Sequence, residues 1–361
     1  MSISLKRSES GFLIMIKIAI QTFKNSGHSG RGVGVYGEKL VNELKHRHND
    51  LEILEFSQIS ELRNKNVSLV HFLTFDLFQR TLDAGLEIPF IVTLHDLTPL
   101  VFSEHFPSGF RGSVNLFFQK RSLQKAKKII TVSEASKKDI LTYLKVAEEK
   151  IEVIYSGVGE EFRKITEIKD LERVKQKYHL PDQFAFYSGN VNWNKNILNM
   201  TRACVDAGLD LVIVGKSFKN TDNLDHPELK SFKQFLAEFG THPKVHLLGY
   251  VQTEDMVCIL NQAILALFVS YYEGFGFPIL EAQSCGVPVI TSESSSMPEI
   301  AGKGALFVDP KNTLEIQHSI EKILGDDKLK SKLIDDGLEN VKRFSWTACA
   351  TETVRLYKSV L

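Results

Sequence analysis

The stretch that decides the fold is Tyr272-Glu273-Gly274-Phe275-Gly276-Phe277-Pro278-Ile279-Leu280-Glu281. It lies between an apolar run at 264–269 and a second apolar segment at 278–285. This order predicts a buried strand that leads through a glycine-rich turn into a helix. Pro278 suits the first helical position, because the N–H that proline lacks would have no partner there. The remaining N–H groups of the first helical turn would face any anion placed before the helix.

The turn itself predicts a cradle for a charged, hydroxylated ligand. Gly274 and Gly276 allow the backbone to approach a ligand closely. Two carboxylates bracket the turn, Glu273 before it and Glu281 one turn inside the helix. A glycosyl diphosphate needs such a combination, with donors for its phosphates and acceptors for its hydroxyls. A plain strand–loop–helix corner of an α/β domain explains the same residues, so the turn alone leaves both interpretations open.

The residues that follow this stretch carry a family resemblance. They read Ala282, then Cys285-Gly286-Val287-Pro288-Val289-Ile290, then Ser296-Met297-Pro298-Glu299-Ile300, with Gly304 and Asp309-Pro310 further on. This order resembles the C-terminal half of the retaining glycosyltransferases of the GT-B fold, in the large family four. The family pattern is E-G-F-G-x-P-x-x-E-A, a small residue, G-x-P-V-I and P-E, and nearly every position is met here.

The resemblance implies an α/β fold of the GT-B type. Two Rossmann-like, doubly wound parallel-sheet domains would face a central cleft, with a C-terminal helix that crosses back to the first domain. We expect an N-terminal acceptor domain at 1–157, a nucleotide-sugar-binding domain at 158–344 and the returning helix at 345–361. The boundary falls at Ser156-Gly157-Val158, which suits a hinge.

Length and composition agree with this organisation. The 361 residues suit two α/β domains better than one core. A chain with 43% hydrophobic and 24% charged residues and zero formal net charge indicates neither disorder nor bulk nucleic-acid binding. Its four cysteines are widely spaced, which argues against a disulfide framework or a zinc site and fits a reducing cytoplasm.

No run approaches the ~20 apolar residues of a membrane span. Residues 1–14 are too weakly apolar for a secretory signal, and a start at Met15 is as plausible as one at Met1.

A glycine-rich loop at 26–34 follows a predicted strand at 16–20 and precedes a helical pattern. Strand, loop and helix in this order open a doubly wound sheet, with the loop at the ligand-binding edge. The glycines miss the dinucleotide fingerprint, which disfavours a Rossmann dehydrogenase. The loop resembles the family's G-x-G-R loop, so Gly30, Arg31 and Gly32 are candidates for contact with a phosphate or the acceptor. Glycines that serve only a tight turn are the alternative.

A further predicted strand at 90–94 ends in His95-Asp96. A side chain at the carboxyl end of a parallel strand points into the ligand crevice. An isolated His–Asp pair is more often structural, but this one matches the family's H-D motif, whose histidine lies beside the transferred sugar. His95 is therefore a site candidate, and Asp96 is a weaker one.

The segment 110–130 combines aromatic, aliphatic and basic side chains. The basic ones are Arg111, Lys120, Arg121, Lys125, Lys127 and Lys128. A basic amphipathic helix can lie on an anionic membrane surface, and an ordinary sheet-covering helix with a solvated lysine face is the alternative. Lipid-linked acceptors are frequent in the resembling family, which implies peripheral contact with the inner membrane face.

In the second half, the loop from Gly189 to Asn196 follows another predicted strand. The family pattern there has Gly-Arg and then a lysine, and both cations bind the donor diphosphate. Lys195 matches the lysine, whereas Asn190 stands where the arginine is usual. Asparagine donates a hydrogen bond without charge assistance, so one phosphate contact is weakened. Arg31 or Lys216 would have to compensate, and the sequence does not decide between them.

The resemblance also implies roles in the transfer of a sugar from a nucleotide donor with retention of configuration. Lys195 and the N–H groups of 274–277 would stabilise the departing diphosphate. Glu273 would hold sugar hydroxyls, Glu281 the ribose hydroxyls, and His95 would accept from a sugar hydroxyl. A hydrolase with two carboxylates is rejected, because residues eight apart across a strand–turn–helix need not flank one bond.

Substrates and cofactors are less readable. By resemblance, the backbone at Tyr250 and Val251 would meet the nucleotide base. The resemblance favours GDP-mannose as the donor and a lipid-linked polysaccharide or O-antigen as the acceptor. UDP-glucose and UDP-N-acetylglucosamine are the next candidates for the donor. The chain has no D-x-D, so we expect neither a metal nor another cofactor. Alternatives are a GT-B-fold epimerase, a remote phosphorylase, and a non-catalytic sugar-nucleotide-binding subunit, which the missing arginine at Asn190 would favour. We expect a cytoplasmic protein, peripheral on the membrane at most.

Overall fold

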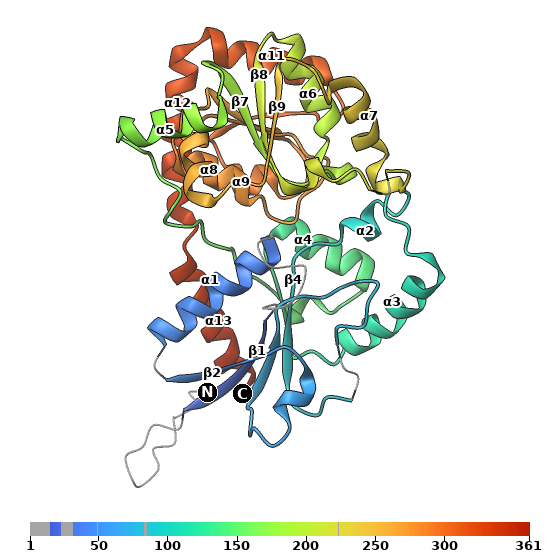
Figure 1. Ribbon diagram of the computed structural model, residues 1–361. Helices are drawn as coiled ribbons and strands as arrows, with labels where there is room; N and C mark the ends of the chain where they lie inside the picture. Colours follow the sequence, from blue (N-terminus) through green and yellow to red (C-terminus); the bar gives the residue numbers. More distant parts are fainter. Residues whose placement is uncertain (1–14, 23–31, 49, 83–84, 223) are drawn as a thin grey trace.

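The computed structural model describes residues 15–22, 32–48, 50–82, 85–222 and 224–361. These residues form two six-stranded sheets in which every pair of neighbouring strands is parallel (Figure 1). The strands of the first sheet are β1 (Ile16–Gln21), β2 (Leu51–Phe56), β3 (Leu69–Phe72), β4 (Phe90–Leu94), β5 (Lys128–Thr131) and β6 (Ile151–Val153). Those of the second are β7 (Phe184–Ser188), β8 (Asp210–Val214), β9 (Val245–Gly249), β10 (Leu265–Phe268), β11 (Val289–Ser292) and β12 (Ala305–Val308). The predicted architecture of two doubly wound sheets is confirmed.

Helices cover both sheets. In the first half they are α1 (Gly32–Arg47), α2 (Thr98–Val101), α3 (Gly109–Leu123) and α4 (Glu134–Asp139), which continues as a π-helical turn at Ile140–Leu144. In the second half they are α5 (Ile168–Tyr178), α6 (Ile197–Asp206), α7 (Lys230–Phe239), α8 (Thr253–Gln262), α9 (Phe277–Ser284), α10 (Met297–Ala301), α11 (Thr313–Gly325), α12 (Asp327–Asn340) and α13 (Trp346–Val360). No helix in the described ranges is long and apolar enough to cross a bilayer.

The strand order explains where a ligand can bind. It is β2-β1-β3-β4-β5-β6 in the first sheet and β12-β11-β10-β7-β8-β9 in the second. The direction of winding therefore reverses between β1 and β3, and again between β7 and β10. In open parallel sheets the loops at such a reversal leave a crevice at the carboxyl ends of the strands. The loops after β7 and β10, which carry Lys195 and Glu273, border that crevice in the second sheet.

The last helix returns to the first half, as the resemblance implied. Figure 1 shows α13, in red, beside α1. The hydroxyl of Tyr357 lies 2.7 Å from Nδ1 of His71 on β3, and Lys358 pairs with Asp50 at 2.5 Å. Trp346, at the start of α13, is buried against residues of both halves. The chain thus crosses between the halves twice, once after β6 and once before α13.

One hydrophobic cluster is shared by the two halves. Phe275, Leu280 and Ile300 of the second half join Tyr36 and Trp346 in a core that also contains residues of the first sheet. The ring of Phe277 stacks on Trp346 with 6.1 Å between centroids. The loop that opens α9 therefore lies at the seam between the halves. The exact domain boundary at residue 157 stays a prediction.

Two predicted elements differ slightly from the structure. Helix α9 begins at Phe277, so Pro278 occupies the second helical position, where its missing N–H is equally harmless. Gly276 precedes the helix with a φ of 118°, which a residue with a side chain rarely adopts. Helix α3 ends at Leu123, so the basic residues at 125–128 belong to the turn and strand that follow it.

Candidate functional site

Two loops of the second half meet through a salt bridge. Nζ of Lys195, at the end of the loop after β7, donates to both carboxylate oxygens of Glu273 at 2.7 Å. The hydroxyl of Ser270, just after β10, donates to the same carboxylate at 2.7 Å. Both charged side chains are about one-fifth exposed, so they are accessible from the crevice but partly shielded from water. The fold thus brings together two of the predicted site residues from positions 78 apart in sequence.

Beside this pair lies a run of backbone N–H groups that have no partner among the described residues. Among the described residues, none accepts a hydrogen bond from the N–H of Gly274, Phe275, Gly276 or Phe277. Residues 274–276 are buried, and buried N–H groups without partners are rare in folded proteins. The run leads into the amino end of α9, where the helix dipole also favours negative charge. The arrangement is a preformed nest for an anion.

Serine hydroxyls hold this run in place, and sequence reasoning missed them. The hydroxyls of Ser295 and Ser296 lie 2.5 and 2.9 Å from the carbonyl oxygen of Glu273. The Ser296 hydroxyl also lies 2.7 Å from the carbonyl oxygen of Phe275. With the carbonyls turned toward these serines, the intervening N–H groups remain available. The signal that could have found them is the serine run at 294–296, which directly precedes α10.

Glu281 lies in the second turn of α9 and is half-buried. Burial, and then the nearby Glu161 carboxylate, raise the pKa of Glu281 to about 8. In the described part of the chain its carboxylate accepts no hydrogen bond, so it is shielded from water without a protein partner. A ligand whose hydroxyl groups donate hydrogen bonds to this carboxyl group would stabilise its ionised form. Its predicted contact with ribose stays a prediction.

His95 lies after β4, in the first half, and faces the seam. Its Nε2 lies 3.1 Å from the carbonyl oxygen of Leu73, which can only accept, so Nε2 carries the proton and Nδ1 is the free acceptor. Burial lowers the pKa of His95, although the bond to Leu73 and the charge of Asp96 act in the opposite direction. His95 is therefore neutral at pH 7. Asp96 accepts from the backbone N–H of Thr98 at 2.9 Å and so has a structural role at the start of α2.

Asn190, where the family pattern has arginine, is exposed, and its Oδ1 lies 3.3 Å from the backbone N of Asn192. Gly215 after β8 lies directly against the same turn, since a Cβ at Gly215 would lie only 2.2 Å from the carbonyl oxygen of Gly189. The next residue, Lys216, is exposed. Of the two cations considered as replacements for the arginine, Lys216 is thus placed beside Asn190, whereas Arg31 lies outside the described residues.

The other predicted site residues are more scattered. Tyr250 is 72% exposed and follows β9, an edge strand two places from β7, while Val251 is buried. These positions do not test the predicted contact of Tyr250 and Val251 with the nucleotide base, which stays a prediction. Gly32 begins α1, and a Cβ there would lie 3.9 Å from the ring of Phe277, so α1 starts over the amino end of α9. Gly30 lies outside the described residues, as does the leader at 1–14.

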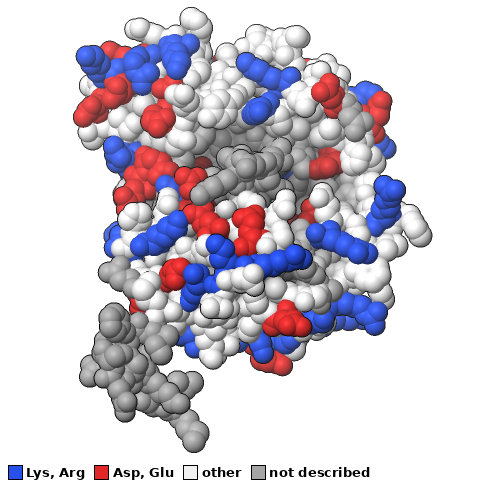
Figure 2. Space-filling model, turned by 60° about the horizontal axis from the view of Figure 1, so that its bottom comes forward, with Lys and Arg blue, Asp and Glu red and all other residues white. Residues whose placement is uncertain are grey.

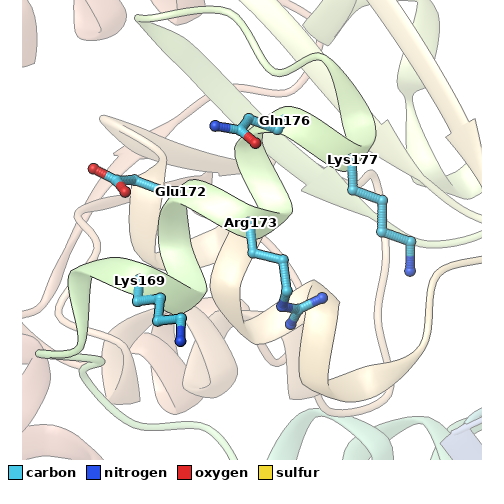
Figure 3. Close-up of a pocket in the computed structure, with 5 residues that line it drawn as sticks. All are labelled: Lys169, Glu172, Arg173, Gln176 and Lys177. Carbon is cyan, nitrogen blue, oxygen red and sulfur yellow. The ribbon is translucent and has the colours of Figure 1, made fainter.

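A hollow on α5 has no part in this site. Figure 3 shows its lining residues Lys169, Glu172, Arg173, Gln176 and Lys177, all on α5. Arg173 and Lys177 already hold the buried carboxylate of Asp255 at 3.1 and 2.6 Å. The hollow is open to solvent and contains none of the predicted site residues. No group of three or more metal-ligating side chains occurs in the ranges that the structure describes.

Two facing doubly wound sheets, with an anion nest and a lysine at the crevice of the second, define a GT-B glycosyltransferase. The sequence matches the family models described as "Glycosyltransferase Family 4" over residues 25–162 and "Glycosyl transferases group 1" over residues 168–339. The chain belongs to glycosyltransferase family 4, and the protein is a glycosyltransferase.

Individual relatives agree with this assignment. The chain is 31% identical over 276 residues to the O-antigen chain mannosyltransferase B of Escherichia coli, across 74% of this chain and 70% of that protein. It is 26% identical to the serotype-specific mannosyltransferase WbdA of Escherichia coli over 72% of this chain but only 32% of WbdA. Among solved structures, sucrose-phosphate synthase from Thermosynechococcus elongatus matches with a TM-score of 0.73 at 18% identity, covering 96% of this chain and 99% of that one. HepE from Anabaena, in complex with UDP and glucose, matches with a TM-score of 0.73 at 17% identity, covering 95% and 100%.

Proposed function

We propose that the protein transfers mannose from GDP-mannose, with retention of anomeric configuration, to a growing lipid-linked polysaccharide such as an O-antigen. The names of the relatives in Escherichia coli support mannose as the sugar and an O-antigen as the product. The observation that carries the proposal is the run of N–H groups at 274–277, which lack a partner in the described part of the chain and lie beside Lys195; this run suits a diphosphate leaving group.

The site supports a simple division of labour. The N–H groups at 274–277 and the Lys195 ammonium bind the diphosphate and stabilise the charge that builds on it as the glycosidic bond breaks. Glu273 orients the sugar through its hydroxyls, and Glu281 accepts from the ribose. His95, neutral with a free Nδ1, accepts from a sugar hydroxyl on the opposite wall of the cleft. The leaving phosphate takes the proton of the acceptor hydroxyl on the same face.

We also propose that no metal ion is needed. Divalent cations serve other glycosyltransferases by neutralising the diphosphate. Here the helix dipole of α9, the free N–H groups and Lys195 would supply that stabilisation. Lys216, beside the turn that carries Asn190, would supply the second positive charge that the family usually obtains from arginine.

The acceptor would be reached from a membrane surface. Phe110, Phe117 and Phe118 on α3 are 86%, 56% and 44% exposed, and Arg121 and Arg80 lie over the rings of Phe117 and Phe118. Residues 109–128 contain six basic residues and no acidic one. Figure 2 shows Lys and Arg side chains along the lower right of the molecule, the side on which α3 lies in Figure 1. Exposed aromatic rings flanked by cations fit the interface of an anionic membrane. We therefore propose a protein bound peripherally to the cytoplasmic membrane face, with no nucleic-acid partner.

The test is an assay of GDP release and sugar transfer with purified protein, GDP-mannose and a lipid-diphosphate-linked glycan. We expect GDP release that depends on the acceptor, and a product with the α configuration of the donor by NMR. Turnover of the donor without any acceptor would favour an epimerase. Donor binding without turnover of this or any other nucleotide sugar would favour the non-catalytic subunit.

A further inference from the structure

Helix α4 of the first half holds the 272–277 loop of the second half, which we call the donor loop. The hydroxyl of Ser133, immediately before α4, donates to the carbonyl oxygen of Gly274 at 2.7 Å. The hydroxyl of Ser136 lies 3.0 Å from the carbonyl oxygen of His95 and 3.3 Å from that of Gly274. Both serines are fully buried. A single helical turn therefore contacts the backbone of His95 and the backbone of the donor loop at once.

Two more contacts join the same elements. The hydroxyl of Tyr272, the first residue of the donor loop, donates to the carboxylate of Asp139 at the end of α4. The carboxylate of Glu299 on α10 accepts from the backbone N–H of Glu134 at 2.9 Å and from the hydroxyl of Tyr155 at 2.7 Å. Both ends of α4 are thus tied to the second half. The contacts of Ser133, Ser136 and Tyr272 are separate from the two chain crossings, whereas Tyr155 lies in the crossing that follows β6.

The fit between the halves is close at the centre of this contact. A Cβ at Gly274 would lie 2.5 Å from the carbonyl oxygen of His95 and 2.8 Å from Cβ of Asp96. The absence of a side chain at Gly274 therefore allows the donor loop to lie directly on the His95–Asp96 peptide. The hydroxyl of Ser136 spans the two carbonyl oxygens at that point.

We propose that Ser133 and Ser136 are positioning residues, which set the distance between His95 in one half and the donor loop in the other. The inference rests on the proposed function and extends it. The groups assigned to the donor diphosphate and ribose, namely Lys195, Glu281 and the N–H groups at 274–277, all belong to the second half. His95, to which the sugar contact is assigned, comes from the first half, so its alignment with the sugar depends on how the two halves meet.

The consequence is a separation between binding and turnover. Without the Ser136 hydroxyl, the carbonyl oxygens of His95 and Gly274 lose their shared donor, and the His95 peptide can shift locally against the donor loop. The donor site within the second half stays whole, so affinity for a nucleoside diphosphate is retained. Misplacement of a reacting group by about 1 Å costs up to ~100-fold in rate. We expect kcat to fall by about tenfold or more.

The experiment compares Ser136→Ala and Tyr272→Phe with the wild-type protein. Each variant breaks one contact between α4 and the donor loop, and neither removes the N-terminal capping hydroxyl of α4, which is that of Ser133. Thr201→Val is the matched control, because its hydroxyl on α6 is fully buried and has no hydrogen-bond partner within the described ranges. The readouts are kcat with saturating donor and the Kd of GDP by calorimetry.

We expect kcat to fall in both variants with the Kd of GDP within about twofold of wild type, and the control to keep both values. A kcat equal to that of wild type would overturn the inference. A Kd that rises in proportion to the loss of kcat would also overturn it, because α4 would then only maintain the folded loop. Absence of transfer by the wild-type protein would count against the proposed function instead, and the two failures are therefore distinguishable.

Discussion

Among single residues, Lys195 is the one for which two partners would compete, because its ammonium is paired with Glu273 and is also the proposed ligand of the diphosphate. Both oxygens of Glu273 accept from Lys195. In the proposed function, a diphosphate that binds to Lys195 would draw its ammonium away from Glu273, whose carboxylate would then be available for sugar hydroxyls. The salt bridge gives each of the two partly buried charges a partner.

This competition predicts opposite effects of one substitution. Glu273→Gln removes the competing charge, so GDP should bind more tightly by about tenfold, since a hydrogen bond to a charged group contributes ~1.5–3 kcal/mol. The same change removes the acceptor for the sugar, so kcat should fall by about a hundredfold. Calorimetry of GDP and initial rates of transfer measure the two effects. Glu238→Gln, which breaks the exposed pair with Arg202, is the control and should change neither. Weaker GDP binding by Glu273→Gln would contradict the account.

Glu281 predicts how donor affinity depends on pH. With a pKa of about 8, its carboxylate form is a minority at pH 7 and predominates at pH 9. Ribose hydroxyls donate to the ionised form, so GDP affinity should rise by about tenfold from pH 7 to pH 9, with release of a proton at the lower pH. Calorimetry in buffers of different ionisation enthalpy measures both quantities. Glu281→Gln should remove the dependence, and exposed Glu254→Gln should keep it. An equally steep rise in Glu281→Gln would dismiss the ribose assignment.

The same group predicts a change in stability with a definite sign. The pKa of Glu281 in the folded protein lies above its ordinary value of 4.5. The stability contributed by the neutral carboxyl group is therefore complete below that value and is lost as the pH rises through about 8. Glu281→Gln, which cannot ionise, should resist urea better than wild type at pH 9 and equally well at pH 4.5. A constant difference at both pH values would contradict the buried position of this carboxyl group.

At the scale of elements, α3 is the helix whose sequence predicts a contact outside the chain. Its exposed phenylalanines and cations predict binding to vesicles that contain anionic phospholipid. Phe117→Ser with Phe118→Ser should weaken that binding by tenfold or more, because each buried phenylalanine contributes ~1.5–3 kcal/mol. Sedimentation with vesicles at two salt concentrations measures it, and high salt should also weaken binding. Ile168→Ser on α5, a residue 69% exposed, is the control. Equal binding by both variants would assign α3 to ordinary packing.

The elements themselves were largely predictable, and the reason is physical. Buried parallel strands are continuous apolar runs, and the glycine-rich turns that end them are visible as breaks in those runs. The strand before Glu273 and the helix after it were therefore predicted correctly. The predicted start of the helix, at Pro278, differs by one residue from its observed start at Phe277. Ser133 is the N-cap of α4, and its hydroxyl accepts from the N–H of Ser136 at 3.1 Å, a role for which serine is strongly preferred at a helix start.

The contacts between loops were not predictable from periodicity. Ser133 meets Gly274, and Tyr272 meets Asp139, across 141 and 133 residues of sequence, and no local pattern encodes such a pairing. The salt bridge of Lys195 with Glu273 follows from the adjacency of β7 and β10 in the sheet, and the sequence analysis did not predict that adjacency. The unpartnered state of Glu281 depends on which side chains surround it, and that is set by packing rather than by local sequence.

In the whole molecule, the proposed sugar-transfer site is divided between the two halves. The second half contributes a ready-made anion nest, and the first half contributes His95 and the helix that holds the nest against it. Two crossings of the chain and a shared hydrophobic cluster keep the halves in register. In the proposed function, the acceptor would enter the seam beside His95, and the diphosphate would stay bound to the second half.

We propose above that the N–H groups at 274–277 and Lys195 bind a diphosphate without a metal ion. The most direct test is calorimetric titration of GDP and GMP, with UDP and UMP in parallel, into the wild-type protein and Lys195→Met in the presence of EDTA. The account predicts that the diphosphate of the preferred base binds the wild type about a hundredfold more tightly than its monophosphate, and that Lys195→Met loses most of this difference. Diphosphate binding no tighter than monophosphate binding, or binding that appears only when Mn²⁺ replaces EDTA, would contradict it.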